Sequence, residues 1–205
     1  MLDTTLRKIL DPALKPAACL LVNIGFSANQ ITILGFIFGV FSWITLAMNM
    51  YYFALGMIII SRVLDGLDGM VAQKTIQTQI GGFLDIVLDF IFYSGVPFFF
   101  AIGRPEFTLS ATFLIFSFVG TGSSFLAYSV IAAKHGITNK KHKNKAIYYL
   151  GGLTEGTETI LLFIFICLNP DDFAQAAWIF GSLCWLTTLI RIYTAFVNFK
   201  TLESL

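Results

Sequence analysis

Residues 31–50 include no charged side chain. As an α-helix, a stretch of this length rises by about 1.5 Å per residue and extends over roughly 30 Å, the thickness of the hydrocarbon core of a bilayer. The rest of the chain has the same character, because 57% of its 205 residues are hydrophobic and only 12% are charged. This balance is typical of a polytopic membrane protein and excludes an ordinary soluble domain. With a net charge of +1 and no basic stripe interleaved with aromatic residues, a nucleic-acid partner is also excluded.

The apolar segments predict an all-α fold with six transmembrane helices. Their expected ranges are 31–50, 52–72, 80–102, 108–134, a fifth segment that passes through 151–158 to 168, and 173–199. Ser27 is the expected N-cap of the first helix, and Gln30, three residues later, completes a capping box. An even number of crossings places both termini on the same side of the membrane.

The first 26 residues differ from these spans. Apolar residues recur there at helical spacing, with basic residues on the opposite side. Pro12 and Pro16 are incompatible with one straight helix, so we expect two short amphipathic pieces that lie in the membrane interface. The chain is then one membrane domain, residues 1–205, with an interfacial segment at 1–26 and a six-helix core at 27–205.

The distribution of basic residues predicts the orientation. With six crossings, Arg104 alone falls on the side away from the termini. The residues that fall on the side of the termini are Arg7, Lys8, Lys15, Lys74, Lys134, Lys140, Lys141, Lys143, Lys145 and Lys200. By the positive-inside rule, the termini are cytoplasmic. The lysine cluster at 140–145 is interpreted as an orientation signal that contacts anionic lipid.

Four aspartates interrupt the apolar stretch 58–90, namely Asp65, Asp68, Asp85 and Asp89. Each ionisable side chain at membrane depth costs roughly 2.5–3.5 kcal/mol on insertion scales, so four together need compensation or a function. The first pair is spaced i, i+3 and the second i, i+4, so each pair shares one helical face. If the two helices form an antiparallel hairpin, Asp68 lies opposite Asp85 and Asp65 lies opposite Asp89.

Four facing carboxylates in a low dielectric cannot all stay ionised unless cations are bound among them. An all-carboxylate cluster without His or Cys suits Mg²⁺ or Mn²⁺, and Mg²⁺ commonly shares its coordination with substrate phosphates. The alternative is a buried polar network that only joins helices. Such a network needs matching bases at the same depth, and Arg62 balances only one of the four acids. The pattern therefore favours a metal site that takes a phosphate-bearing ligand.

The same residues resemble a family signature. The CDP-alcohol phosphatidyltransferase family carries D-x2-D-G-x2-A-R-x7or8-G-x3-D-x3-D. This chain has the fixed residues Asp65, Asp68, Gly69, Ala72, Gly81, Asp85 and Asp89. Gln73, followed by Lys74, stands where the family has arginine. Asn29 and Thr32 are similar to the family's P-N-x-x-T entry to the first span, with Ala28 in place of proline.

The resemblance implies an activity and a role for each residue. Two divalent ions, Mg²⁺ or Mn²⁺, are held by the four aspartates, and Asp89 also accepts the proton of an incoming alcohol. A phosphatidyl group passes from CDP-diacylglycerol to that alcohol, with release of CMP, in phospholipid biosynthesis. The residues implied to contact the CDP moiety are Asn29, Thr32, Gly66, Gly69, Ala72, Gln73, Lys74 and Gly81. Family likeness also implies a homodimer and, especially over residues 147–159, a bacterial inner-membrane location.

The acceptor alcohol is left open. Glu155 and Glu158 share a helical face and either bind a polar acceptor headgroup or pair with Arg62, Arg191 or Lys134. Lys134 and Arg191 are themselves candidate acceptor ligands. Two other functions stay open as well. One is a CDP-aminoalcohol phosphotransferase that acts on diacylglycerol, and the other is a cation transporter that uses the acids as an ion path.

Overall fold

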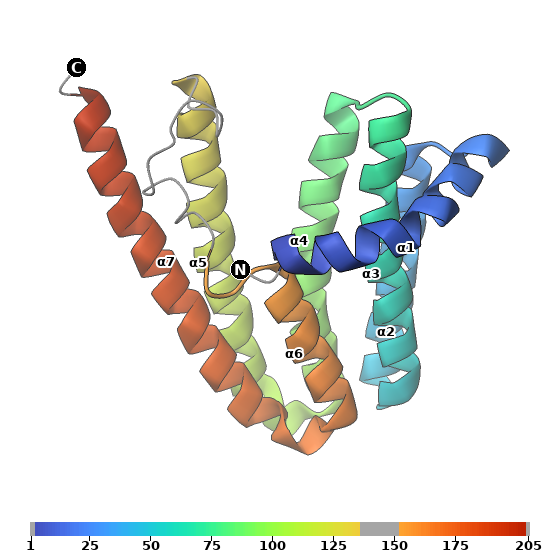
Figure 1. The fold of residues 1–205 in the computed structure, drawn as a ribbon. Coiled ribbons are helices and arrows are strands. Elements are labelled where there is room, and N and C mark those ends of the chain that lie inside the picture. The colour runs from blue at the N-terminus through green and yellow to red at the C-terminus, as the bar shows by residue number, and fades with distance from the viewer. Residues whose placement is uncertain (1–2, 136–151, 204–205) are drawn as a thin grey trace.

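The protein is all-helical over residues 3–135 and 152–203, which are the residues that this computed structural model describes (Figure 1). The main helices are α1 (Asp3–Ile24), α2 (Ala28–Ala47), α3 (Tyr51–Lys74), α4 (Gln79–Gly103), α5 (Thr108–Lys134), α6 (Gly156–Leu168) and α7 (Phe173–Glu203). Short 3₁₀ helices, η1 (Pro105–Phe107) and η3 (Pro170–Asp172), precede α5 and α7. The predicted lysine cluster at 140–145 lies outside the described residues.

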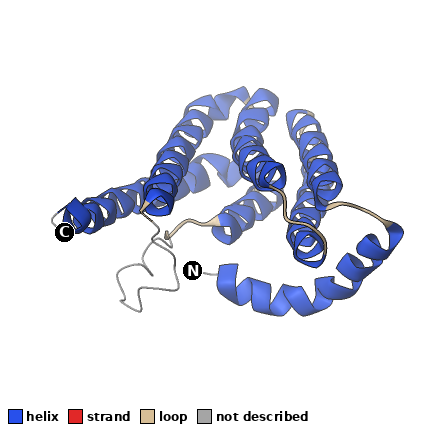
Figure 2. Ribbon diagram, turned by 90° about the horizontal axis from the view of Figure 1, so that it is seen from above, coloured by secondary structure: helices blue, strands red, loops and turns tan. Residues whose placement is uncertain are grey.

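Helix α1 is continuous, so the prediction of two separate pieces was wrong. Both Pro12 and Pro16 lie inside it. Figure 2 shows that α1 curves along the outside of the bundle. Two prolines four residues apart remove backbone donors from the same side of a helix, which bends it without ending it. On its inner side, Leu14 and Ala18 pack against Leu67 and Val71 of α3.

Helix α2 begins at the predicted cap. The Ser27 hydroxyl accepts a hydrogen bond from the backbone N–H of Gln30 at 3.4 Å, and the Gln30 side chain accepts one from the backbone N–H of Ser27 at 2.9 Å. The predicted capping box is therefore confirmed. At the other end, Asn49 adopts a positive φ of 60°, which turns the chain into α3 within a few residues.

Helix α2 organises the half of the molecule that contains the aspartates. It packs closely against both α3 and α4, whereas α3 and α4 are antiparallel neighbours with few close backbone approaches to each other. Helices α5 and α7 form a second packed pair, which joins the first group through contacts of α4 with α5. Helix α6 contacts both α3 and α7. Aromatic rings pack where α4 ends and α7 begins, and there Phe100 stacks on Phe173 with 4.1 Å between ring centroids.

Within the described residues, four helical segments are long and apolar enough to cross a membrane. They are Ala28–Ala47, Gln79–Gly103, Pro105–Lys134 and Pro170–Lys200. Helix α3 carries the charged residues of the aspartate motif, and α6 has only 13 residues. At about 1.5 Å per residue, α6 is shorter than the hydrocarbon core is thick. The protein is thus a multi-pass membrane protein, and the crossings by α3 and α6 stay predictions.

The fifth segment differs from its predicted helical range. Helix α6 starts at Gly156, with Glu155 as its N-cap, and residues 152–155 are not helical. Figure 1 shows that α6 begins part-way along the bundle. The preceding sequence contains two adjacent glycines, which are poor helix formers because they lose the most backbone entropy on folding.

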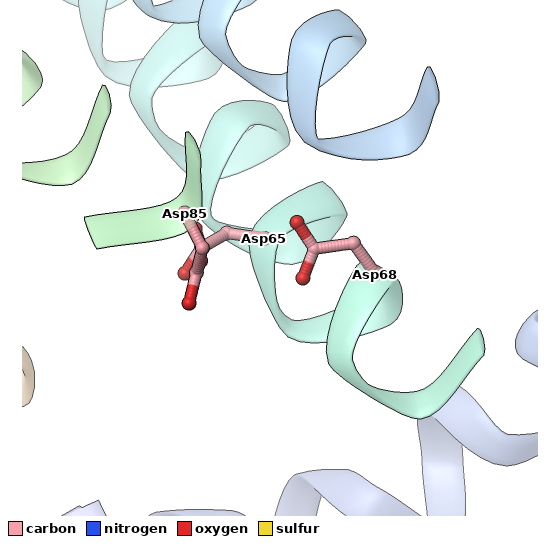
Figure 3. A group of neighbouring side chains, drawn as sticks. All are labelled: Asp65, Asp68 and Asp85. Carbon is pink, nitrogen blue, oxygen red and sulfur yellow. The ribbon is translucent and has the colours of Figure 1, made fainter. Parts of the chain in front are cut away.

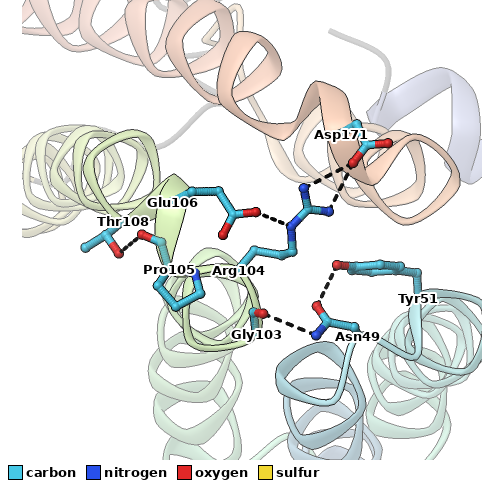
Figure 4. Close-up of polar contacts among 8 residues, drawn as sticks. All are labelled: Asn49, Tyr51, Gly103, Arg104, Pro105, Glu106, Thr108 and Asp171. Atoms are coloured by element: carbon cyan, nitrogen blue, oxygen red, sulfur yellow. Dashed lines mark hydrogen bonds and ion pairs between the residues drawn. The ribbon is translucent and has the colours of Figure 1, made fainter.

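A polar cluster ties together the turns at the end of the bundle opposite the α3–α4 turn (Figure 4). Arg104 donates to Glu106 at 2.5 Å and to Asp171 at 3.1 Å, which links the α4–α5 turn to η3. Asn49 donates to the Gly103 carbonyl oxygen at 3.2 Å, which adds the α2–α3 turn. Exposed ion pairs of this kind contribute about 0–1 kcal/mol each, so the cluster fixes the relative positions of the turns more than it stabilises the fold.

Candidate metal and substrate site

Three of the four motif aspartates meet in the space between α3 and α4. Asp65 and Asp68 lie near the C-terminal end of α3, and Asp85 lies in the second turn of α4. One carboxylate oxygen from each lies within 4.8 Å of the other two. Figure 3 shows these side chains directed toward one another. Because α3 and α4 are both packed on α2 and not tightly on each other, their acids face a shared space.

The fourth aspartate, Asp89, takes part in an ion pair instead. Its Oδ1 atom lies 2.7 Å from Nη1 of Arg62. The same Nη1 atom lies 3.6 Å from Oδ2 of Asp65. Asp65 and Asp89 were predicted to lie opposite each other, and the guanidinium group of Arg62 connects them. The sequence pattern predicts Arg62 as a base for one acid and does not predict this bridge, although Arg62 precedes Asp65 by three residues on the same helical face.

The Arg62 side chain is fixed by its surroundings. Only 9% of it is exposed, and its guanidinium carbon lies 4.1 Å from the centroid of the Phe92 ring. Nη2 donates to the hydroxyl of Ser61 at 3.2 Å. Among the described residues, Nε has no hydrogen-bond partner. The Phe92 ring and the Ser61 hydroxyl thus hold the guanidinium group of Arg62 beside the aspartates.

Thr32 of α2 supports the carboxylate of Asp68. Its hydroxyl donates to Oδ2 of Asp68 at 2.5 Å, and it also lies 3.1 Å from the Ala28 carbonyl oxygen. Asp68 is 5% exposed, so this hydroxyl restricts the orientation of a buried acid. Hydrogen bonds of this kind to a ligand carboxylate fix its direction and tune its affinity for a metal. The family resemblance assigns Thr32 to the CDP moiety and does not predict this contact.

The glycines predicted to contact the CDP moiety have different surroundings. A Cβ atom on Gly81 would lie 2.5 Å from Oδ1 of Asn29, so these two predicted residues are direct neighbours. A Cβ on Gly66 would meet Leu14 of α1 at 3.5 Å, whereas a Cβ on Gly69 would have no neighbour within 4 Å. The remaining predicted residues lie on the last turn of α3, with Ala72 half-buried and Gln73 and Lys74 exposed.

A small cleft opens beside the acids. It is shared by α2, α3 and α4. The residues that line it are Thr32, Gly35, Phe36, Ser61, Arg62, Asp65, Asp85, Leu88 and Asp89. Three of the motif aspartates therefore border one recess, with Arg62 beside them.

The candidate acceptor ligands are not part of this cleft. Glu155 and Glu158 form a capping box at the start of α6, in which the Glu155 backbone N–H donates to Glu158 at 3.0 Å. Arg191 is 8% exposed and donates to the Thr121 carbonyl oxygen of α5 at 3.0 Å. Lys134 is exposed at the end of α5. The two glutamates and the arginine thus have structural contacts of their own.

The donor set fits a hard divalent cation. All three converging ligands are carboxylate oxygens, which Mg²⁺ and Mn²⁺ prefer to nitrogen or sulfur. Oxygens on opposite sides of one Mg²⁺ lie about 4.2 Å apart, since each Mg–O distance is near 2.1 Å. Three ligands of one octahedral ion include at least two neighbouring pairs, which lie about 3.0 Å apart. The separations of up to 4.8 Å therefore have to shorten by side-chain rotation before all three oxygens contact one ion.

Comparison with known proteins decides the family. A model of the family described as CDP-alcohol phosphatidyltransferase matches residues 26–194. The chain belongs to the CDP-alcohol phosphatidyltransferase family. Inner membrane protein YnjF of Escherichia coli is 48% identical to it over 204 residues, which cover 99% of each chain. An archaetidylinositol phosphate synthase of Pyrococcus horikoshii is 26% identical over 176 residues, which cover 85% of this chain and 86% of the relative.

Solved structures of a phosphatidylinositol phosphate synthase share the fold. The phosphatidylinositol phosphate synthase of Mycobacterium tuberculosis in its apo form aligns with a TM-score of 0.67 and 18% identity, over 88% of this chain and 95% of that one. The same enzyme with CDP-DAG bound aligns with a TM-score of 0.62 and 19% identity, over 88% and 92% of the two chains. Its complex with manganese and citrate aligns with a TM-score of 0.63 and 20% identity, over 88% of each. Family membership favours phosphatidyl transfer over the cation-transporter alternative.

Proposed function

We propose that this chain is a metal-dependent phosphatidyltransferase of the inner membrane, which moves a phosphatidyl group from CDP-diacylglycerol to an alcohol and releases CMP. The observation that carries the proposal is the convergence of Asp65, Asp68 and Asp85 within 4.8 Å, in a chain that belongs to this family. The related M. tuberculosis synthase has been solved with CDP-DAG and with manganese, which supports the choice of donor and of a divalent cation.

In the proposed site, Asp65, Asp68, Asp85 and Asp89 hold two divalent ions, Mg²⁺ or Mn²⁺. When bound, the ions neutralise the diphosphate of the donor and stabilise the charge that develops on the leaving group. Thr32 orients Asp68 through its hydroxyl. Asn29 and Gly81, together with Gly66, Gly69, Ala72, Gln73 and Lys74, form the pocket for the CDP moiety. The close approach of Asn29 to Gly81 supports this grouping.

Asp89 is the proposed general base. It accepts the hydroxyl proton of the alcohol, whose oxygen attacks the phosphorus of the phosphatidyl group in line with the bond that breaks. The bond between this phosphorus and the bridging oxygen breaks, and its electron pair leaves with CMP. The product is a phosphodiester of the acceptor. The 29% exposure of the Asp89 side chain supports this role, because an incoming alcohol must reach it.

The single-domain organisation, the interfacial position of α1 and a homodimeric assembly are part of the proposal. So is the orientation, with the termini and the aspartates on the cytoplasmic side. Helix α2 begins at the same end of the bundle as the α3–α4 turn, and α7 ends there. This supports a site on the side of the termini. The relative named as an inner membrane protein, at 48% identity, supports the location. Lys134, Arg191, Glu155 and Glu158 remain the proposed acceptor ligands.

The experiment incubates purified protein in detergent with CDP-diacylglycerol, Mg²⁺ or Mn²⁺ and a panel of alcohols, and follows CMP release and the mass of the lipid product. CDP-choline and CDP-ethanolamine with diacylglycerol form a second arm, which tests the aminoalcohol phosphotransferase alternative.

Asp89→Asn is expected to abolish turnover. The matched control is Asp171→Asn at the opposite end of the bundle, where the side chain is 86% exposed, and it is expected to keep full activity. Turnover near the wild-type rate in Asp89→Asn, or full activity after exhaustive chelation, contradicts the proposal.

A further inference from the structure

Arg62 separates the fourth aspartate from the other three. Nη1 of Arg62 lies 2.7 Å from Asp89 and 3.6 Å from Asp65, while Asp65, Asp68 and Asp85 form the close group. A charge-assisted hydrogen bond of this length is among the stronger polar contacts in proteins. Asp89 therefore has a cationic partner before any metal ion is bound.

The two members of this ion pair differ in freedom of movement. Arg62 is 9% exposed, lies over Phe92 at 4.1 Å and donates to Ser61. Asp89 is 29% exposed and borders the cleft. A guanidinium packed on a ring and bound to a hydroxyl loses several contacts if it moves, whereas a short carboxylate side chain changes rotamer at little cost. If the pair opens, Asp89 moves and Arg62 stays.

The charges at the site predict when the pair opens. The four aspartates and Arg62 together carry a net charge of −3. One divalent ion reduces this to −1, and a second brings it to +1. The second ion therefore has to compete with Arg62 for the carboxylate of Asp89. The diphosphate of the donor, which is anionic, offsets the excess positive charge.

We infer that Arg62 is a positioning residue that orders the loading of the site. The first divalent ion binds Asp65, Asp68 and Asp85, and the second binds when Asp89 exchanges Arg62 for the metal, a step that the donor diphosphate favours. The inference rests on the proposed metal-dependent function. It also assigns a role to a buried cation in a chain that has Gln73 where the family has arginine.

The test is a Mn²⁺ titration of the purified full chain without substrates, in which electron paramagnetic resonance measures the free ion. Wild-type protein is expected to bind one ion tightly and a second at least about tenfold more weakly, the size of a typical coupling between contacting charges. In Arg62→Met, the second ion is expected to bind about tenfold more tightly than in wild type, since Asp89 has lost its competitor. In Asp89→Asn and in Arg62→Met/Asp89→Asn, a single ion is expected.

The matched control is Arg104→Met. Arg104 also pairs with an aspartate, Asp171, at 3.1 Å, but it lies at the end of the bundle opposite the α3–α4 turn. Its removal is expected to leave both Mn²⁺ affinities unchanged. If Arg62→Met does not fold, Arg62→Gln, which is polar and neutral, takes its place with the same expected shift.

Two negative results have different meanings. A wild-type protein that binds no Mn²⁺ contradicts the proposed metal-dependent function itself. A folded Arg62 variant whose second Mn²⁺ binds with unchanged or lower affinity overturns the role of Arg62 and leaves the proposed function standing. A second ion in Arg62→Met/Asp89→Asn also overturns the inference, because the effect of Arg62 would then not pass through Asp89.

Discussion

The hydroxyl of Thr32 donates a hydrogen bond to the carboxylate of Asp68 at 2.5 Å, across the contact between α2 and α3. This bond connects the first long apolar helix to the motif aspartates. Asp68 is 5% exposed, so protein groups and not solvent orient its oxygens. The contact makes α2 part of the site as well as a packing partner of α3 and α4.

Thr32→Val is expected to weaken metal binding with little effect on folding. Valine has nearly the shape of threonine, so the packing of α2 on α3 is retained while the hydrogen bond to Asp68 is lost. Hydrogen bonds to charged groups contribute about 1.5–3 kcal/mol, which corresponds to roughly 10- to 150-fold in affinity. Mn²⁺ titration and the rate of CMP release measure the loss. Thr32→Ser keeps the hydroxyl and is expected to stay near wild type, and equal losses in both variants would show that the hydroxyl is not responsible.

The alanine variants of the adjacent residues Gly81 and Gly82 provide a matched test of the proposed CDP pocket. A Cβ on Gly81 would lie 2.5 Å from Oδ1 of Asn29 and 2.9 Å from the Thr78 hydroxyl, whereas a Cβ on Gly82 would have no neighbour within 4 Å. Gly81→Ala therefore displaces Asn29. We expect its KM for CDP-diacylglycerol to rise by about tenfold or more, because small misplacements of substrate-binding groups have large kinetic effects. Gly82→Ala is expected to keep the wild-type KM. The assignment of Asn29 to the donor pocket fails if Gly81→Ala folds and binds donor normally.

Gln73→Arg is expected to strengthen donor binding. Gln73 is exposed on the last turn of α3, so an arginine fits there without repacking. The guanidinium group of arginine donates hydrogen bonds to a diphosphate that are about twice as strong as those donated by the neutral amide of glutamine. The gain of about 1 kcal/mol corresponds to a roughly fivefold lower KM for CDP-diacylglycerol. Lys74→Gln is the reciprocal variant, and an increase in KM there shows that the neighbouring lysine supplies part of the missing charge. A KM that does not fall in Gln73→Arg indicates that the diphosphate lies elsewhere.

Helical periodicity predicted the convergence of Asp65, Asp68 and Asp85, but it also placed Asp89 opposite Asp65, where Arg62 lies between them. The spacings of Asp65 with Asp68 and of Asp85 with Asp89 place each pair on one helical face, and the antiparallel order of α3 and α4 brings Asp65, Asp68 and Asp85 together. The cap at Ser27 was also predictable, because capping depends on residues close in sequence. The shared helical faces and the cap rest on local geometry, whereas the meeting of the two faces also requires the antiparallel order of α3 and α4.

The contacts that depend on neighbouring helices were not predictable in the same way. The bridge from Arg62 to Asp89 requires the distance between α3 and α4, which α2 sets by packing against both. The continuity of α1 through Pro12 and Pro16 depends on its packing against α3, which offsets the hydrogen bonds that the prolines remove. The late start of α6 follows from an N-cap at Glu155 that the apolar pattern does not reveal.

Gly95→Ala is expected to destabilise the protein, and Gly56→Ala provides its control. A Cβ on Gly95 of α4 would overlap the indole ring of Trp43, which is 8% exposed and stacks on Phe99 with ring centroids 5.4 Å apart. The overlap forces the indole or the helix to shift, at a cost of about 1–3 kcal/mol that exceeds the gain in helix propensity of about 1 kcal/mol. A Cβ on Gly56 of α3 would have no neighbour within 4 Å, so that variant shows the propensity gain alone.

Thermal unfolding in one detergent, followed by circular dichroism, is expected to give a lower Tm for Gly95→Ala and an equal or higher Tm for Gly56→Ala. A Tm for Gly95→Ala at or above the wild-type value would mean that α2 and α4 do not approach each other this closely at Trp43.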